Sequence, residues 1–322
     1  MIKKLDKSKL ILNIGVLPLP LGGVTIHLKR LMYELRSNEL NKYSIFYDYK
    51  KESLIIGIKK FLRSDIVHIH FSNKYLRLFV ILLSRALRKK CIITFHGKYS
   101  FKNFLDYLSL KFSTISLVLN NYSYDAAVKK LSDHSKIKLI SAFIPPTSEE
   151  GTLSIETDIK INKFIAKFDI VACTNAHNYV LDINGEDLYG IGFLLDYFSE
   201  HNDVGLIVCD PSGNLLKNYK KFSISKNVLF ITKPEPFVEV IKKSNFFIRA
   251  TTTDGDSLSI KEALYYGIKT IVTNCVDRPA GCYVFRKGDK ESLKKQIFNE
   301  NLLKIKTIEN GALQIIELYN KI

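Results

Sequence analysis

Short apolar runs of strand length alternate with segments of helical spacing along most of this chain. The runs in its first half are Leu10–Gly15, Tyr43–Tyr47, Asp65–His70, Cys91–Phe95, Ser116–Leu119 and Ile137–Ile140. Apolar side chains recur at helical spacing in the segments 24–35, 52–62 and 74–88 between them. Repeated strand–helix units predict a parallel sheet with helices on its faces, because parallel strands need a crossover connection. The fold class is therefore α/β.

The alternation is interrupted once and then resumes. Two prolines, Pro145 and Pro146, open a polar stretch that ends at Gly151, and this is the best candidate for an interdomain linker. The strand-length runs beyond it are Phe168–Cys173, 204–209, 227–231, Asn245–Ala250 and Thr270–Thr273. A length of 322 residues suffices for two such domains. We predict two doubly wound domains, 1–148 and 149–300, followed by a helical segment, 301–322; the polar segment 152–166 stays unassigned.

Composition excludes several classes of protein. No apolar run reaches about 18 residues, so no transmembrane helix is expected. The first residues lack the apolar core of a signal peptide. The five cysteines are scattered and form no Cys-x-x-Cys pair, which makes a metal site unexpected. Three of them lie in apolar strand-like runs, which indicates small buried side chains in a reducing cytoplasm.

Basic residues are concentrated in the first half. Residues 1–150 contain 26 lysines and arginines against 11 acids, an excess of 15, whereas residues 151–322 contain 22 against 21, an excess of one. A solvated cationic surface would account for this, but so lopsided a distribution more often indicates an anionic partner.

The stretch from Thr251 to Gly267 carries the strongest motif. It lies between two strand-length runs, and Ile260, Ala263, Leu264 and Gly267 follow helical spacing, so the order is strand, loop, helix, strand. Ser257 or Ser259 can cap the helix. The first turn of such a helix suits an anion such as a phosphate. Spacing alone is equally compatible with an ordinary capped helix.

This stretch resembles the donor-binding motif of retaining glycosyltransferases of the GT-B fold, family 4 type. The motif is a carboxylate, seven residues and a glutamate, here Asp254 and Glu262, although the family usually has Glu at the first position. The resemblance implies that Asp254 holds a hydroxyl of the donor sugar and that Glu262 holds the ribose diol. The amides between them would cradle the sugar and phosphate, and five of the seven intervening residues are assigned to donor binding: Gly255, Asp256, Ser257, Leu258 and Ser259. It also implies two Rossmann-like domains facing a cleft, with a final helix that crosses back to the first domain.

Two weaker motifs match the same family. Gly22 and Gly23 lie between a strand and a helix, an arrangement that brings backbone close to a phosphate and resembles the family's N-terminal glycine loop. His96 and Gly97 directly follow a strand, where ligands bind in such sheets. In the family this histidine approaches the reactive carbon of the sugar, so we assign His96 and Asp254 to the catalytic site. His68 and His70 are expected to be structural.

The loop from Asn175 to Gly190 departs from the family. Members usually carry an Arg and a Lys here that neutralise the donor diphosphate, whereas this loop contains neither and has Tyr189 before Gly190. Arg278 is our first candidate for the missing cation, and Lys233 and Arg249 are the others; Asn175 is included among the donor-binding residues.

We therefore expect a retaining glycosyltransferase of hexosyltransferase type. It would use a nucleotide-sugar, most simply a UDP-sugar, without metal or cofactor, and act on a glycan or lipid-linked acceptor in bacterial surface polysaccharide synthesis. The basic first half predicts a peripheral position on the anionic inner face of the cytoplasmic membrane. Three alternatives stay open: a catalytically silent nucleotide-sugar-binding subunit, suggested by the missing Arg and Lys; an epimerase of the same fold; and a nucleic-acid-binding protein, which no motif supports.

Overall fold

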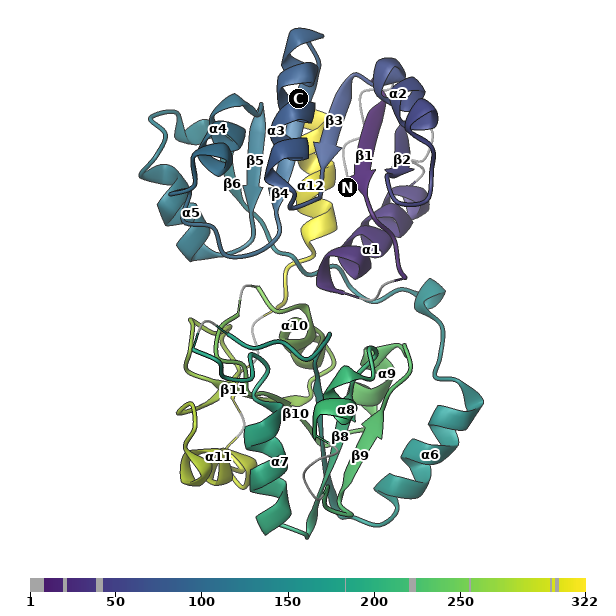
Figure 1. Cartoon of the computed structure of the whole chain (residues 1–322), viewed down its shortest axis with the longest axis vertical. Coiled ribbons are helices and arrows are strands. Elements are labelled where there is room, and N and C mark those ends of the chain that lie inside the picture. Colours follow the sequence, from purple (N-terminus) through teal and green to yellow (C-terminus); the bar gives the residue numbers. More distant parts are fainter. Residues whose placement is uncertain are drawn as a thin grey trace. The chain divides into compact units, whose positions relative to one another are not determined.

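The chain forms two compact units, shown in the computed structural model in Figure 1. The first unit comprises residues 1–145 and 309–322, and the second comprises residues 146–308. The structure describes residues 9–19, 22–38, 43–182, 184–219, 224–254, 256–301, 303–304 and 307–322. The sequence placed the two divisions after residues 148 and 300. Because each unit has its own sheet and cores, the two are described separately.

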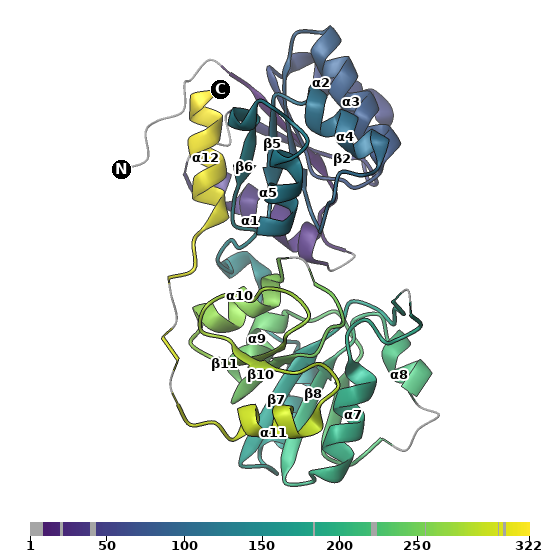
Figure 2. The ribbon, with the colours of Figure 1, turned by 90° about the vertical axis from the view of Figure 1, so that its left-hand side faces the viewer.

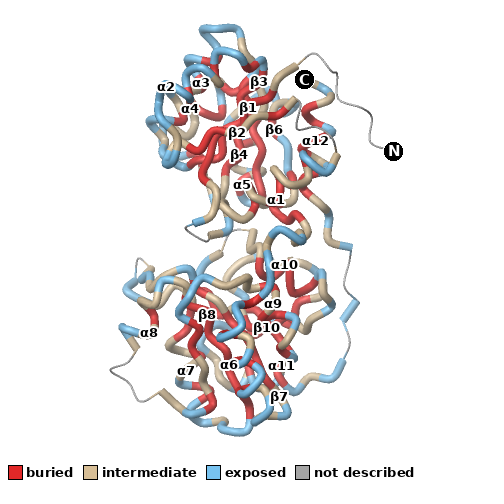
Figure 3. The backbone as a smooth tube through the Cα atoms, turned by 90° about the vertical axis from the view of Figure 1, so that its right-hand side faces the viewer, coloured by how far each residue is buried: buried red, intermediate tan, exposed pale blue. Residues whose placement is uncertain are grey.

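A six-stranded parallel sheet forms the centre of the first unit. Its strands are β1 (Ile11–Gly15), β2 (Ser44–Asp48), β3 (Ile66–Ile69), β4 (Lys90–Phe95), β5 (Ile115–Val118) and β6 (Ile137–Leu139), in the order β2-β1-β3-β4-β5-β6. Its helices are α1 (Gly23–Ser37), α2 (Leu54–Arg63), α3 (Lys74–Ala86), α4 (Phe104–Phe112), α5 (Asn121–Val128) and α12 (Gly311–Lys321). Most strand side chains are buried on both faces, which is why these segments are nearly continuous apolar runs (Figure 3).

The two faces of this sheet are covered by different helices. One core packs β-strand side chains against Leu31 and Leu35 of α1 and against Ile315 and Tyr319 of α12. The other core contains side chains from α2, α3, α4 and α5. Figure 2 shows α12 on the opposite side of the sheet from α2, α3 and α4. The sequence-based prediction that the final helix returns to the first domain is confirmed.

The second unit repeats the same architecture with a different strand order. Its strands are β7 (Ile170–Asn175), β8 (Val204–Cys209), β9 (Val228–Ile231), β10 (Phe246–Arg249), β11 (Lys269–Thr273) and β12 (Tyr283–Phe285), in the order β12-β11-β10-β7-β8-β9. Its helices are α6 (Ile155–Ile165), α7 (Ile191–Glu200), α8 (Asn214–Tyr219), α9 (Phe237–Lys242), α10 (Leu258–Tyr265) and α11 (Lys290–Ile297). Residues of α7, α8 and α11 pack in one core, and residues of α6, α9 and α10 pack in the other.

The predicted α/β fold with two parallel sheets is confirmed, and several elements had been missed. The unassigned segment 152–166 contains α6, whose N-cap Ser154 accepts a hydrogen bond from the Thr157 amide. Elements α4, α8, β12 and α11 had no predicted counterpart. The predicted helical segment 301–322 contains a described helix only from Gly311, and its residues Leu302 and Ile305 lie outside the described residues. Among the described residues, no helix combines the length and apolarity needed to cross a bilayer.

Candidate functional site

Each sheet has a point at which its chain connections reverse direction, and the polar clusters of both units lie there. In the first unit this point is between β1 and β3, and in the second it is between β7 and β10. Ligands of open α/β sheets bind outside the carboxyl ends of the strands at such a point. The predicted residues His96, Asn175 and Asp254 all lie at or just beyond a carboxyl end in these regions.

Helix α10 begins directly after the loop that follows β10. Its N-cap is Ser257 rather than Ser259, so Glu262 lies in the second turn. The Ser257 hydroxyl is 3.3 Å from the Ser259 hydroxyl and makes no side-chain capping bond to the helix. No acidic residue occupies the first turn. The first-turn amides of this helix therefore favour an anion, as the sequence predicted.

Asp254 lies between two arginines. Its Oδ2 accepts from Arg278 Nη1 at 3.0 Å and from Arg249 Nε at 3.2 Å. The Asp254 side chain is 8% exposed, that of Arg278 5% and that of Arg249 12%. Burial alone would raise the pKa of Asp254, but the two guanidiniums outweigh it and lower the pKa below its usual value. Two cations around one carboxylate leave an excess positive charge among these three groups.

The two arginines differ in how tightly they are held. Arg278 donates to Thr273, the last residue of β11, at the carbonyl at 2.9 Å and at the hydroxyl at 3.0 Å. Arg249 makes longer bonds, to the Asn175 carbonyl at 3.3 Å and to Asn175 Oδ1 at 3.4 Å. Arg249 thus bridges the ends of β7 and β10, and its geometry leaves more freedom to turn toward a ligand.

The loop that lacks the family's Arg and Lys is fixed beside Arg249. The Thr252 amide donates to the Leu188 carbonyl at 2.9 Å, and the Tyr189 ring centroid is 5.2 Å from the Arg249 guanidinium carbon. Gly190 has φ +65°, and a Cβ there would lie 2.1 Å from the Ala250 carbonyl oxygen. A glycine is therefore required at this close approach. Arg249, on the adjacent strand, presents a cation to the same loop.

The other predicted donor residues have the following positions. Glu262 is buried in α10 at 5% exposure, and Asp256 pairs with Lys261 in the same helix. Leu258 and Ser259 open the helix, and Gly255 lies outside the described residues. Lys233, an alternative cation, pairs with Glu156 at the surface with 62% of its side chain exposed.

In the first unit a continuous chain of polar contacts contains three histidines. Thr94 Oγ1 is 2.8 Å from His68 Nε2, and His68 Nδ1 is 2.6 Å from the Tyr319 hydroxyl. The Tyr319 hydroxyl donates to Asn13 Oδ1 at 2.9 Å. Asn13 Oδ1 also lies 3.3 Å from His70 Nε2. The chain ends at His96, whose Nε2 is 3.3 Å from His70 Nδ1.

These contacts determine which nitrogens carry protons. Asn13 Oδ1 can only accept, so His70 Nε2 is protonated. Burial, together with the neighbouring histidines, lowers the pKa of both His70 and His96 well below the usual value, so both rings are neutral at pH 7. His70 Nδ1 then carries a lone pair and accepts from His96 Nε2. His68, with both nitrogens bonded to protein hydroxyls, has the structural role that the sequence predicted.

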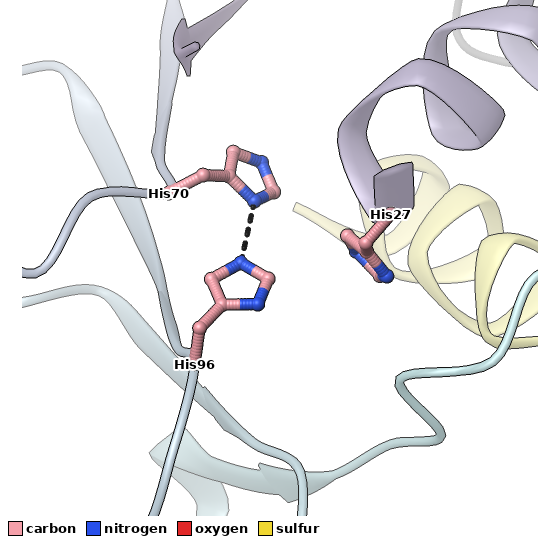
Figure 4. Close-up of side chains that lie close together, drawn as sticks. All are labelled: His27, His70 and His96. Carbon is pink, nitrogen blue, oxygen red and sulfur yellow. Dashed lines mark hydrogen bonds between the residues drawn. The ribbon is translucent and has the colours of Figure 1, made fainter. Parts of the chain in front are cut away.

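His27, which the sequence did not single out, joins this group from α1. Its Nδ1 donates to the Ala142 carbonyl at 2.8 Å, while its buried Nε2 finds no hydrogen-bond partner among the described residues. Burial lowers the pKa of His27 to about 4, the Ala142 bond opposes this and Arg30 adds to it. Figure 4 shows His27, His70 and His96 around one space. The only signal in the sequence was that His27 lies four residues before Leu31, on the apolar face of the predicted helix.

The glycine pair lies at the start of α1. Gly22 is the N-cap, its amide donates to Thr25 Oγ1 at 3.1 Å, and a Cβ on Gly23 would meet no atom within 4 Å. Sterics within the described residues therefore do not require glycine at position 23. Its predicted contact with a donor stays a prediction.

Comparison with known proteins rests on structure. No protein-family model and no curated protein sequence matches the chain. HepE from Anabaena, solved with UDP and glucose, superposes with a TM-score of 0.63 at 12% identity, over 97% of this chain and 95% of that one. The chain has the GT-B fold. A UDP-GlcNAc 2-epimerase from Methanocaldococcus jannaschii gives a TM-score of 0.58 at 15% identity, covering 96% and 99% of the two chains.

A third structure, that of a galactosyltransferase, is also similar to this chain. The lipopolysaccharide outer core galactosyltransferase WaaB superposes with a TM-score of 0.54 at 13% identity, over 97% of this chain and 94% of that one. Both transferases and epimerases thus share the GT-B fold of this chain, so the fold alone does not choose between their reactions.

Proposed function

We propose that this chain is a glycosyltransferase that moves a sugar from a UDP-sugar to a glycan or lipid-linked acceptor. The observation that carries the proposal is the Arg249–Asp254–Arg278 cluster beside the first turn of α10. A nucleotide diphosphate needs this combination of positive charge and helix amides. Support for the uridine nucleotide comes from HepE, whose structures contain UDP and UDP-glucose.

In this proposal Arg249 and Arg278 take the place of the missing loop cations. They would stabilise the charge that develops on the leaving diphosphate, without a metal, and Asp254 would hold both guanidiniums in position. Asp254 would also meet the sugar hydroxyl, and Glu262 the ribose diol, as the resemblance implies. Retention of anomeric configuration and the role of His96 near the sugar follow from the same resemblance.

The acceptor side of the proposal places the first unit on an anionic membrane. Helix α2 exposes Leu54, Ile55, Ile58 and Leu62, and α3 exposes Tyr75, Phe79 and Leu82. Lys59, Arg63 and Arg85 on the same two helices are exposed as well. Apolar side chains flanked by cations suit the surface of an anionic bilayer. Two further lysines of this region, Lys60 and Lys89, are instead engaged with Glu52 and with the Leu62 carbonyl.

The first test of the proposal is ligand binding. UDP or the correct UDP-sugar at about a hundred times its dissociation constant should add about 2.7 kcal/mol to the free energy of unfolding, measured by thermal shift. Arg278→Ala should weaken UDP binding far more than uridine binding, because only UDP presents the diphosphate. Lys233→Ala, which removes an exposed cation, is the matched control. An equal effect of Arg278→Ala on both ligands would remove Arg278 from the diphosphate site.

The second candidate function is epimerisation of a nucleotide-sugar, favoured by the likeness to two structures of the UDP-GlcNAc 2-epimerase from Methanocaldococcus jannaschii. Incubation of the bound nucleotide-sugar with and without acceptors separates the possibilities. A transferase yields UDP and a glycosylated acceptor, and NMR of the product reports whether the anomeric configuration is retained. An epimerase yields an isomeric nucleotide-sugar without acceptor, whereas binding with neither product indicates a silent subunit.

A further inference from the structure

Three histidine side chains of the first unit lie close together, and the group contains no carboxylate. One nitrogen of each of His27, His70 and His96 lies within 4.8 Å of the other two. His27 Nε2 is buried and has no hydrogen-bond partner among the described residues, which leaves a lone pair unsatisfied. His70 Nδ1 also carries a lone pair, because its ring is protonated at Nε2.

The spacing of two of these nitrogens already suits a metal. Zinc lies about 2.0–2.1 Å from each imidazole nitrogen, so two ligands at a tetrahedral zinc are roughly 3.3 Å apart. His70 Nδ1 and His96 Nε2 are 3.3 Å apart. Without metal, one proton between them makes this a hydrogen bond. With metal, that proton moves to His96 Nδ1, and both facing lone pairs become ligands.

The atoms behind the rings match those behind metal-binding histidines. Such a histidine almost always donates its other N–H to a carbonyl or carboxylate oxygen, which fixes the ring and its tautomer. His27 Nδ1 donates to the Ala142 carbonyl, and His70 Nε2 donates to the Asn13 side-chain oxygen. Burial also keeps the rings neutral, which is the form that binds metal.

We propose that His27, His70 and His96 form a zinc site within the first unit. Three histidines and a fourth, exchangeable ligand are a common zinc arrangement, and imidazole suits zinc among the divalent metals. His27 and His70 are both 2% exposed, whereas His96 is partly exposed and gives the metal its access. The buried Arg30 is close enough to lower the pKa of His27, and its positive charge also repels a zinc ion. The three nitrogen ligands have to outweigh this repulsion.

This proposal departs from the sequence-based expectation of no metal and does not rest on the proposed transfer reaction. Zinc binding is measured without any nucleotide, so its failure would leave UDP binding untouched. Conversely, a chain that binds no nucleotide could still hold zinc.

The test is a zinc titration of the chelator-treated full chain by calorimetry at pH 7, with Co²⁺ as a spectroscopic probe. We expect one zinc per chain and a visible Co²⁺ spectrum of tetrahedral intensity without a sulfur charge-transfer band. His27→Gln and His96→Ala should each weaken zinc binding at least about a hundredfold, and Asn13→Ala, which removes the support of His70, about ten- to a hundredfold. His96→Ala alters a partly exposed loop position, so it remains informative if the His27 variant misfolds.

Two other histidines provide matched controls. His68→Gln removes a buried ring of the same cluster whose nitrogens are both occupied, and His134→Gln removes an exposed ring. Both should change zinc affinity less than about threefold. The proposal is overturned if the wild-type chain binds no stoichiometric zinc, if His96→Ala binds it as tightly as the wild type, or if the Co²⁺ spectrum reports cysteine ligands.

Discussion

The two polar clusters occupy equivalent places in their sheets yet are chemically opposite. In the first unit Tyr319 comes from α12 and His27 from α1, and the other residues come from β1, β3 and β4 or just beyond them; in the second unit the residues come from β7, β10 and β11 or just beyond them. In both cases these are the first strand, its neighbour across the reversal point and the next strand outward. The first cluster consists of neutral rings and hydroxyls, and the second of two guanidiniums and a carboxylate. The scaffold therefore determines where a site lies, and the side chains placed there determine its chemistry.

The largest expected effect is on unfolding free energy, when one polar group of each cluster is replaced by a group of similar shape. Asp254→Asn keeps the shape but leaves two largely buried arginines without their counter-charge, so we expect a loss of about 3 kcal/mol in unfolding free energy. Tyr319→Phe removes one hydroxyl from the neutral cluster and should cost about 1–2 kcal/mol. Urea unfolding of both variants makes the comparison. Equal losses would show that charge does not distinguish the clusters energetically.

The next largest effect should come from acid, which should lower the stability of the first unit at a higher pH than that of the second. The pKa of His27 is about 4 in the native chain and about 6.5 when unfolded. Between these values only the unfolded chain binds the proton, so stability is lost as the pH falls from 6.5 to 4. At about 1.4 kcal/mol per pKa unit, His27 alone accounts for roughly 3 kcal/mol. Asp254, with its lowered pKa, loses its stabilising contribution only below its unfolded value of 3.8.

Amide hydrogen exchange of the chelator-treated chain, followed separately for the two units, is the measurement. The groups near His27 are His68, His70, His96 and Arg30, none of which supplies a negative charge. As the pH falls from 6.5 toward 4, exchange in the first unit should accelerate relative to the intrinsic rate, and His27→Gln should make this dependence shallower. Parallel behaviour of the two units would contradict the expectation.

UDP affinity should depend on Glu262 in the second unit and not on His27 in the first. Glu262→Ala should weaken UDP about ten- to a hundredfold, because hydrogen bonds to a charged group contribute roughly 1.5–3 kcal/mol. His27→Gln should leave UDP affinity within about twofold. Calorimetry with UDP provides both values. Normal UDP binding by Glu262→Ala would mean that the nucleotide does not lie along α10 as proposed.

The smallest expected effect concerns the outer surfaces of the units. Lys59→Ala and Arg63→Ala on α2 should each weaken binding to anionic vesicles by about 1 kcal/mol, or roughly fivefold. Ile55→Glu should weaken it as well, whereas Ile155→Glu, at a still more exposed apolar position of α6 in the second unit, should not. Vesicle sedimentation at low salt tests this. Equal binding to neutral and anionic vesicles would contradict it.

The sequence predicted the fold well because parallel strands buried on both faces leave a strong local pattern. The strands at Leu10–Gly15 and Cys91–Phe95 were placed within about a residue of β1 and β4. The helices α8 and α11 are short or polar and lack such a pattern. The motif Asp254 to Glu262 was visible because it is contiguous.

The contacts within the sites were not visible, because they join residues distant in the chain. Arg249 and Arg278 had been considered singly as cations, and only the structure brings them to one carboxylate. His27, encoded in a helix before β2, reaches His70 and His96 through tertiary packing that periodicity does not encode.

The return of α12 to the first unit has a consequence for biosynthesis. Tyr319, which bonds His68, follows it by 251 residues. At a translation rate of about 5–20 residues per second, the ribosome needs roughly 10–50 seconds to cover that distance. During this time the second unit is synthesised and can fold, while the sheet face that α12 covers waits for its apolar partners. The first unit is thus the first to be synthesised and the last to be completed. Until α12 emerges, its uncovered apolar sheet face is the surface that chaperones would have to protect.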